Sequence, residues 1–183
     1  FTTAPSTLFN GELMTYKIAH LADVHIKNLK YHYEYRHVFD QLYAILREKE
    51  VDYIYIGGDI AHTKTQISPE FVQLCSEFFT NLANIAPLYL ILGNHDGNLR
   101  NKSRQNAITP IVNALNNPNI HLLAAAGETL VTDNLAFNVL SVFDEDNWVK
   151  PSDPNRINVA LYHGCVAGVK TDTGWVMDYG DHD

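Results

Sequence analysis

Four short apolar runs in the sequence each end at a cluster of polar side chains that can bind a metal ion. Short runs that are rich in Ile, Val, Leu and Tyr and closed by glycine are typical of buried β-strands. The runs span residues 16–22, 53–56, 88–92 and 157–162. The clusters that follow them are Asp23-Val24-His25, Gly57-Gly58-Asp59, Gly93-Asn94-His95-Asp96 and His163-Gly164. The pattern therefore places metal-capable side chains at the ends of several strands.

Helical patterns separate the first three runs. Residues 34–49 carry apolar side chains three to four positions apart, and we expect this face to be buried. Residues 68–86 begin with Ser68, a favourable N-cap, followed by Pro69 at the first helical position. Residues 107–115 form a third, shorter helical pattern. The predicted buried face of the first helix consists of Val38, Leu42, Ile45 and Leu46.

This alternation of strands and helices predicts a parallel α/β core. The second half of the chain differs, because residues 122–123, 129–132 and 135–142 are strand-like with only turns between them. Asp133-Asn134 is a favourable turn between the last two of these strands. We therefore expect a second sheet, mixed or antiparallel, packed on the first.

The bulk properties limit the class of protein. With 183 residues, 46% of them hydrophobic, the chain suits one globular domain. It has no apolar run of about 18 residues, the length that a membrane-spanning helix requires. Its two cysteines form no CxxC pair, and we expect a reducing, cytoplasmic setting. We expect residues 1–13 to be an extension, disordered or added in cloning, and residues 14–183 to be the folded domain.

The formal net charge of −8 bears on the partners of the chain. An acidic chain is a poor match for a basic nucleic-acid binder that is held by phosphate contacts. It is compatible with an enzyme that grips phosphate through bound cations, because divalent ions can invert the sign of a site. Part of the acidity then consists of metal ligands.

The strand-end clusters predict a metal site. Ligands of open α/β sheets bind beyond the carboxyl ends of strands, where neighbouring parallel strands bring their closing clusters together. Carboxylate, imidazole and amide donors suit Mn, Fe or Zn better than ions that demand thiolates. Asp59 is the natural bridge between two ions, because the glycines before it let backbone and metals approach closely. The expected ligands are Asp23, His25, Asp59, Asn94 and His163.

Each cluster taken alone has a simpler explanation. Asp-x-His is a common pair, Gly-Asp after a strand is often only a turn, and His163-Gly164 alone fits a structural histidine. Gly93-Asn94-His95-Asp96 is more specific, because three polar side chains with donor atoms follow a buried run. The recurrence of all four clusters, each at a strand end, favours the metal site.

The same four motifs resemble those of the calcineurin-like metallophosphoesterase superfamily. Protein phosphatases of that superfamily continue the Gly-Asp motif with Val-Asp-Arg-Gly, whereas this chain continues with Ile60-Ala61-His62-Thr63. A histidine three residues after the bridging aspartate is similar to SbcD-type DNA repair nuclease subunits, especially bacteriophage and large-virus members. The resemblance covers residues 15–183 and implies an α/β/β/α sandwich, in which two mixed β-sheets are flanked by helices.

The resemblance also implies how the ligands divide between two metal ions. Asp23 and His25 would hold the first ion, and Asp59 would bridge both. Asn94 and His163 would hold the second ion. The ions would be divalent, with Mn foremost and Fe, Zn or Mg as alternatives.

Three further residues would act without binding metal, according to the resemblance. His95 would face the scissile phosphate and stabilise its charge or protonate the leaving oxygen. His62 would contact the phosphate or the leaving strand in exonuclease cleavage. Asp96 would orient His95 or a ligand. The nucleophile would be a metal-activated hydroxide that attacks the phosphodiester.

These roles imply a Mn-dependent DNA exo- or endonuclease subunit in double-strand-break repair or recombination. Its expected partners are DNA, an SbcC-type ATPase subunit and, in a homodimer, a second copy, with no membrane; a phage-encoded protein would act in the host cytoplasm. Two alternatives stay open: a small-molecule or cyclic-nucleotide phosphodiesterase of the same superfamily, and a catalytically silent interaction module. Candidates for DNA contacts beside the site loops are Lys64, Arg100, Lys102 and Arg104.

The chain departs from the superfamily in its last motif. Members carry a Gly-His-x-His or Gly-Asp-x-His that supplies one more ligand to each metal ion. Gly180-Asp181-His182-Asp183 is similar, but its histidine is one position early and follows His163 closely. We expect the true motif to lie beyond residue 183, and residues 1–183 alone to bind metal weakly and to have little activity.

Overall fold

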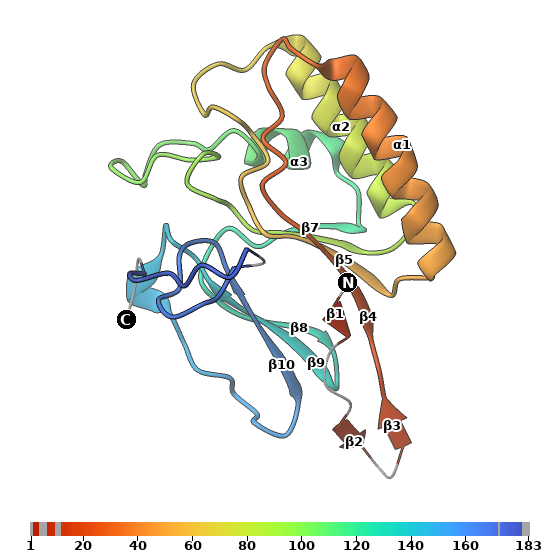
Figure 1. The fold of residues 1–183 in the computed structure, drawn as a ribbon, viewed down its shortest axis with the longest axis vertical. Coiled ribbons are helices and arrows are strands. Elements are labelled where there is room, and N and C mark those ends of the chain that lie inside the picture. Colours follow the sequence, from red (N-terminus) through yellow and green to blue (C-terminus); the bar gives the residue numbers. More distant parts are fainter. Residues whose placement is uncertain (1, 4–6, 10–11, 172, 181–183) are drawn as a thin grey trace.

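The larger of the two main sheets has five strands, four of which run parallel in chain order (Figure 1). The computed structural model describes residues 2–3, 7–9, 12–171 and 173–180. The parallel strands are β4 (Lys17–Leu21), β5 (Tyr53–Ile56), β6 (Leu88–Leu90) and β7 (Ile120–Leu122). β1 (Thr2–Thr3) pairs antiparallel with β4 at the edge of this sheet.

Three α-helices connect the parallel strands. They are α1 (His32–Lys49), α2 (Pro69–Ala83) and α3 (Thr109–Leu115). Crossovers between neighbouring parallel strands are almost always right-handed, so strands laid down in sequential order place every connecting helix on the same face. Figure 1 shows all three helices on one side of the larger sheet, and the buried side chains of each pack into one core with that sheet.

The smaller sheet covers the opposite face of the larger one (Figure 1). Its strands are β8 (Gly127–Thr132), β9 (Leu135–Leu140) and β10 (Ile157–Tyr162), in the order β10-β9-β8. β8 and β9 form an antiparallel hairpin, whereas β10 runs parallel to β9. A short 3-10 turn, η1 (Glu145–Asn147), lies between β9 and β10, and β2 (Thr7–Phe9) pairs with β3 (Glu12–Met14).

The sequence Tyr53-Ile54-Tyr55-Ile56 of β5 shows how the two cores are divided. Successive side chains of a strand point to opposite faces. Ile54 and Ile56 lie in the core with the helices, whereas Tyr53 and Tyr55 face the smaller sheet. Because both faces of β5 are covered, its whole run is apolar or aromatic rather than alternating with charged residues.

The predicted two-sheet α/β architecture is confirmed. The predicted spans of β5 and β10 match the structure, and those of β4, β6 and β9 differ by one or two residues at their ends. Within the described ranges, all the α-helices lie on the larger sheet, so no described residue supplies a helix to the outer face of the smaller one. Parts of residues 1–13 form strands, and the domain boundary at residue 14 stays a prediction. No helix of the described residues is long and apolar enough to cross a membrane.

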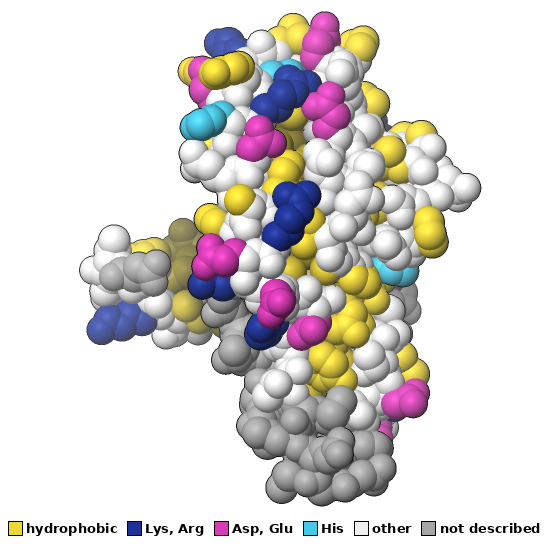
Figure 2. All heavy atoms as spheres, turned by 90° about the vertical axis from the view of Figure 1, so that its right-hand side faces the viewer, with side chains coloured by type: hydrophobic (Ala, Val, Ile, Leu, Met, Phe, Trp, Pro, Cys, Tyr) yellow, Lys and Arg dark blue, Asp and Glu magenta, His cyan; other side chains and the backbone are white. Residues whose placement is uncertain are grey.

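The predicted buried face of α1 is wrong for two of its four residues. Val38 is 57% exposed and Ile45 is also exposed, whereas Phe39 and Tyr43 are buried. Figure 2 looks toward this side of the molecule, where hydrophobic side chains lie among charged ones of both signs. The helix turns Phe39 inward, where its ring stacks on Phe78 of α2 with ring centroids 4.0 Å apart. Of the predicted face, Leu46 is fully buried and Leu42 is partly buried against the core.

The start of α2 is as predicted. The hydroxyl of Ser68 accepts a hydrogen bond from the backbone N–H of Phe71 at 3.1 Å, and Pro69 begins the helix. The same hydroxyl donates to the carbonyl of Asn28, and the backbone N–H of Ser68 donates to the Asn28 side chain. The N-cap therefore also ties α2 to the loop that follows β4.

The corrected face of α1 gives a direct stability test. We expect Phe39→Ala to lower the free energy of unfolding by about 3–5 kcal/mol, because it leaves a cavity beside Phe78. Val38→Ala, its exposed neighbour, should change it by less than about 0.5 kcal/mol. Urea denaturation of the two variants measures both values. A larger loss for Val38→Ala than for Phe39→Ala would contradict the observed face.

Candidate metal centre

The four polar clusters meet at one place, although they come from two sheets. Three follow the carboxyl ends of β4, β5 and β6 in the larger sheet, and the fourth follows β10 in the smaller sheet. The His163 imidazole at the end of β10 reaches the carbonyl of Gly57, with Nδ1 and the oxygen 2.7 Å apart. The clusters therefore form one site where the two sheets meet.

Asp59 lies at the centre of this site and is only 4% exposed. Its Oδ1 accepts the backbone N–H of His95 at 2.9 Å. Its Oδ2 lies 3.6 Å from Nε2 of His25 and 3.4 Å from Nε2 of His163. Burial would raise the pKa of Asp59, but the hydrogen bonds and charges of His163 and His95 outweigh it and hold that pKa below its ordinary value. One carboxylate oxygen is thus fixed by the backbone and the other faces two imidazoles.

His163 presents a defined nitrogen to Asp59. A carbonyl can only accept, so Nδ1 of His163 must donate its hydrogen to Gly57, and Nε2 is the atom turned toward the carboxylate. Metal-binding histidines are commonly oriented by such a backbone carbonyl. Without a metal ion, the hydrogen bond to Asp59 raises the pKa of His163 to about 9, against the opposing effect of burial. Oδ1 of Asn94 lies 3.2 Å from the same Nε2.

The loop after β4 holds Asp23 and His25 in an uncommon backbone conformation. Both residues have positive φ, 53° and 48°, and Asp59 has a φ of 51°. Left-handed backbone at non-glycine residues costs roughly 1–3 kcal/mol each and gathers at functional sites. The backbone N–H groups of Asp23 and His25 donate to the carbonyls of Gly58 and Asp59, at 3.2 and 2.9 Å. The ladder between β4 and β5 thus continues into the loops and fixes them side by side.

Two glycines allow these loops to approach each other. A Cβ on Gly58 would lie 2.7 Å from the backbone nitrogen of Gly93, and Gly58 also has a φ of +91°. A Cβ on Gly93 would lie 2.2 Å from Oδ1 of Asp59. Real Cβ atoms do not come this close to other heavy atoms, so any side chain at either position would push the clusters apart.

The side chain of Asp96 bonds to backbone groups of two loops of the site. It is fully buried, and its two carboxylate oxygens accept the backbone N–H groups of Ala61 at 2.8 Å and Gly93 at 2.9 Å. No described contact joins the Asp96 side chain to the His95 ring. Burial raises the pKa of Asp96 to about 6, although both N–H groups act in the opposite direction. Asp96 therefore ties the Asp59 loop to the Asn94 loop rather than orienting His95 directly.

His95 and His62 lie beside the cluster, on the side of His25. Nδ1 of His95 lies 2.9 Å from the carbonyl of His62 and must donate to it, which leaves Nε2 for other contacts. The His25 ring centroid lies 4.9 Å from that of His95 and 5.7 Å from that of His62. His62 is exposed and His95 is partly exposed. Both rings are thus open to a molecule that approaches His25 and Asp59.

The described donor atoms form two groups that share Asp59. His25, Asp59 and His95 make one, and Asp23, Asp59 and His163 make the other, with the donor atoms of each within 4.8 Å of one another. Ligands bound to one ion at about 2.1 Å lie about 3–3.5 Å apart. The separations of 3.4–3.7 Å among Asp23, His25, Asp59 and His163 are close to that range, so these residues fit divalent ions.

The predicted division of the ligands stays a prediction. Asp23 lies 3.7 Å from His25, as expected for partners on the first ion, but it is also grouped with His163. A donor atom of His95 lies within 4.8 Å of those of His25 and Asp59, so this grouping does not separate the role of His95 from that of His25. The structure brings together all five predicted ligands and both predicted catalytic histidines. His182, the weak candidate in the last motif, lies outside the described residues.

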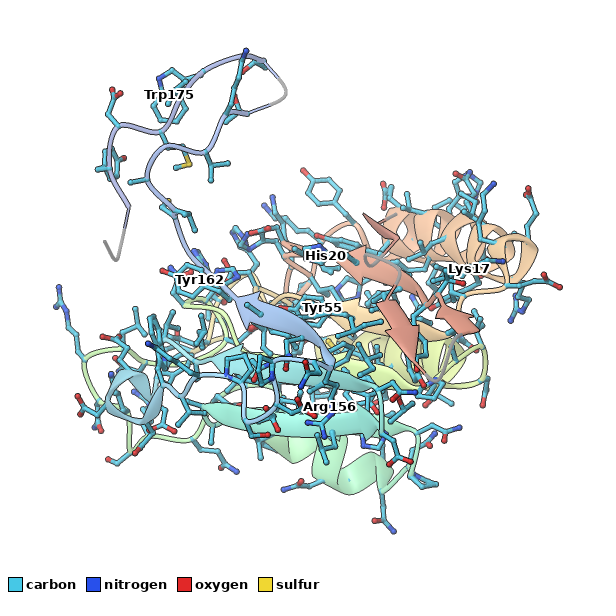
Figure 3. All side chains as sticks on the ribbon, turned by 90° about the horizontal axis from the view of Figure 1, so that it is seen from below. Lys17, His20, Tyr55, Arg156, Tyr162 and Trp175 are labelled. Atoms are coloured by element: carbon cyan, nitrogen blue, oxygen red, sulfur yellow. The ribbon has the colours of Figure 1, made fainter. Side chains whose placement is uncertain are left out.

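An open cleft of about 860 Å³ runs from the cluster along the junction of the two sheets. Asp23, Asp59, Asn94 and His163 line one part of it. His20 of β4 also lines the cleft beside Tyr55, with ring centroids 5.0 Å apart, and Tyr162 of β10 lies on the other side (Figure 3). The segment after β10 that carries Trp175 extends away from both sheets (Figure 3).

Two parts of this site could not be found from sequence patterns. The hydroxyl of Tyr35 on α1 donates to the carbonyl of His25 at 2.7 Å and supports the loop after β4. Leu99, Val142 and Glu145 line the far part of the cleft, and two of them come from the smaller sheet's connections. Neither the spacing of Tyr35 nor the composition of these loops distinguishes them from ordinary surface residues.

The calcineurin-like phosphoesterase family model matches residues 16–180, a span that includes all four clusters. The chain belongs to the calcineurin-like phosphoesterase family. Its members typically bind divalent metals, and membership supports a metal-dependent phosphoesterase. Such an activity would use the cluster of polar side chains at the strand ends.

Relatives of the chain are of two kinds. An uncharacterized protein of Acanthamoeba polyphaga mimivirus is 41% identical in an alignment of 175 residues, and the match covers 88% of this chain. The chain spans only 13% of the length of that relative. The crystal structure of Pseudomonas putida nuclease MPE is 18% identical, covers 86% of this chain and 71% of its own, and has a TM-score of 0.41.

The close approach of Gly93 to Asp59 predicts that a single methyl group disturbs the site. We expect Gly93→Ala to weaken Mn²⁺ binding and to lower the free energy of unfolding by roughly 1–3 kcal/mol. Gly57→Ala is the matched control, because its Cβ would meet the flexible end of His20 at 3.1 Å. Calorimetric metal titration and urea denaturation measure both effects. Equal tolerance of the two substitutions would contradict the packing described for Gly93.

The roles of Asp59 and His95 can be separated by metal titration. We expect Asp59→Asn to abolish Mn²⁺ binding, because the shared carboxylate is lost to both ligand groups. His95→Ala should leave the ions bound and remove cleavage. Calorimetric titration measures metal binding, and a hydrolysis assay measures cleavage. Both assays use the chain together with any residues that the gene encodes after residue 183. The same loss of metal in both variants would show that His95 is a ligand.

Proposed function

We propose that the chain is the metal-binding part of a Mn-dependent DNA nuclease, cleaving phosphodiester bonds with two divalent ions. The observation that carries the proposal is the shared position of Asp59, with one oxygen fixed by His95 N–H and the other facing His25 and His163. A carboxylate between two ligand groups is the arrangement that two-metal phosphoryl chemistry requires. Family membership supports the phosphoesterase part of this proposal.

We propose that the ligand side chains are divided between two metal ions. Asp23 and His25 would hold one ion, Asn94 and His163 the other, and Asp59 would hold both. When bound, two such ions supply the hydroxide nucleophile and the positive charge that phosphodiester cleavage needs. Asp96 keeps the Asp59 and Asn94 loops at a fixed separation through its two backbone hydrogen bonds.

His95 would act on the phosphate or the leaving group. The carbonyl of His62 holds Nδ1 of His95 as a donor, so Nε2 is the nitrogen that can meet a substrate. In its protonated form Nε2 can donate a hydrogen bond to a phosphate oxygen or a proton to the leaving oxygen. Its partly exposed position beside His25 leaves that nitrogen room to do so.

His62 supports the DNA part of the proposal. It follows the bridging aspartate by three residues, as in the SbcD-type nuclease subunits that the sequence resembles. Its exposed ring lies within 6.3 Å of His95, centroid to centroid, so it can meet a strand on the open side of the centre. On this resemblance we also propose a role in double-strand-break repair or recombination, an SbcC-type ATPase partner or a homodimer, and a cytoplasmic site of action.

The net charge of −8 favours a second candidate, a phosphodiesterase for small molecules or cyclic nucleotides. Small substrates need no basic surface beyond the metal ions, whereas a polynucleotide gains affinity from further phosphate contacts. The described cleft is open, which is compatible with either class. Substrate preference therefore separates the two candidates.

A comparison of two activities tests the proposal: cleavage at the ends of duplex DNA and hydrolysis of bis-p-nitrophenyl phosphate. We expect Mn²⁺-dependent release of nucleotides from DNA ends and slower hydrolysis of the small ester. His62→Ala should lower DNA cleavage more than ester hydrolysis, and His37→Ala, an exposed histidine on α1, should change neither. Hydrolysis of the small ester alone would reject the nuclease. Inactivity on both substrates with metal bound would favour a silent interaction module.

A further inference from the structure

The cleft beside the metal centre is longer than the centre itself. Its volume of about 860 Å³ lies near the upper end for small-ligand pockets, which span about 300–1,000 Å³. Four of its lining residues belong to the predicted metal site, and four others, Leu99, Lys102, Val142 and Glu145, form the remote part. A single phosphodiester group at the metals would leave this remote part without a function.

Lys102 gives the remote part a positive charge. Of the described residues that line the cleft, it alone is Lys or Arg. Arg100 and Arg104 lie on the same loop and are exposed, but they do not line the cleft. Lys64, the other candidate near the site, donates to the carbonyl of Asn94 at 3.3 Å and lies next to a predicted ligand. Lys102 is therefore the cation that faces a second part of a substrate.

The loop that carries Lys102 is held at both ends. At its start, Gly97 lies against the ring of Phe143, where a Cβ would come within 2.8 Å of two ring carbons. At its end, the backbone N–H of Ala107 donates to the carbonyl of Asp96 at 2.8 Å. Asn106 also accepts two backbone N–H groups at the start of α3. Lys102 thus projects from a loop anchored on both the metal cluster and the smaller sheet.

The present partner of Lys102 is weakly held. Its Nζ lies 3.7 Å from Oε1 of Glu145, and the two side chains are 45% and 44% exposed. Ion pairs at this distance and exposure contribute little, so a phosphate oxygen can replace the carboxylate. Leu99, which is 42% exposed, and Val142 give an apolar surface beside this charge, suited to a sugar or base.

We propose that Lys102 binds the phosphate next to the scissile one, so that the cleft selects chains with two or more phosphates. Glu145 then opposes this binding, because it pairs with Lys102 and repels the incoming anion. The inference rests on the proposed function, since it takes the scissile phosphate to lie at Asp59 and His163. It makes Lys102 a residue that determines specificity for polynucleotides over single phosphodiesters.

Thymidine oligonucleotides of two lengths test this assignment. The dinucleotide holds one phosphodiester and the trinucleotide holds two, so the ratio of their kcat/KM values reports the second phosphate. We expect the protein to prefer the trinucleotide by about fivefold, the upper range for an exposed ion pair. Lys102→Ala should bring this ratio to about two, the statistical factor for two scissile bonds against one, and Lys102→Arg should keep it. Glu145→Gln should raise the ratio above that of the unchanged protein.

Lys150→Ala is the matched control, because it removes an exposed lysine outside the cleft and should leave the ratio unchanged. Binding of fluorescein-labelled dinucleotide and trinucleotide to the His95→Ala protein in Mn²⁺ gives a readout that does not depend on cleavage. In this binding assay, Lys102→Ala should make the slope of log affinity against log salt concentration shallower for the trinucleotide. The change should correspond to the loss of about one phosphate contact. An undiminished preference in Lys102→Ala, by kinetics or binding, would overturn the assignment.

Failure of the proposed function and failure of the proposal for Lys102 give different results. Hydrolysis of bis-p-nitrophenyl phosphate reports the metal centre without a second phosphate. If neither that ester nor an oligonucleotide is cleaved with metal bound, the phosphodiesterase proposal fails, and the binding ratio still decides the role of Lys102. If the ester is cleaved and the unchanged protein prefers the trinucleotide by no more than the statistical factor, the proposal for Lys102 alone fails.

Discussion

The position of one buried carboxylate depends on nearly every other feature of the site. Asp59 is held through Oδ1 by the backbone of the β6 loop, and its Oδ2 faces imidazoles from the β4 loop and from the smaller sheet. A buried carboxylate is costly without such partners, because burial disfavours its charged form. Hydrogen bonds and charges of His163 and His95 hold the pKa of Asp59 below its ordinary value in spite of burial. The same contacts aim its oxygen at the space between two ligand groups.

The backbone around Asp59 is built for close approach. Gly58 and Gly93 have no room for a side chain, and Asp96 bonds the loops on which they lie. Asp23, His25 and Asp59 take left-handed backbone conformations that hydrogen bonds between the loops hold in place. Strain of this kind persists only where the surroundings determine the conformation. The rigid frame is therefore the pair of parallel strands β4 and β5, extended into the loops beyond their ends.

Much of the fold and the membership of the site followed from sequence, because both depend on local patterns. Apolar runs closed by polar clusters located β4, β5, β6 and β10, and the parallel order of the first three predicted that Asp23, Asp59 and Asn94 would meet. The buried face of α1 could not be found in this way, because Val38 and Phe39 are both apolar and only the ring of Phe78 decides between them. The partners of Asp96 were equally hidden, since they are backbone groups of distant residues. Lys102 differs from its neighbours Arg100 and Arg104 only by its place in the folded cleft.

The origin of His163 in the smaller sheet has a consequence for folding and for metal loading. Its imidazole meets the carbonyl of a residue 106 positions earlier in the chain, across the junction of the two sheets. Contacts of such long sequence separation form late, after the local strand–helix units. Ligands that converge only in the folded chain link ion affinity to the packing of the two layers against each other. An ion held by Asp59 and His163 would link the larger sheet to the smaller one. Retention of the ion would then show that both halves of the domain have assembled.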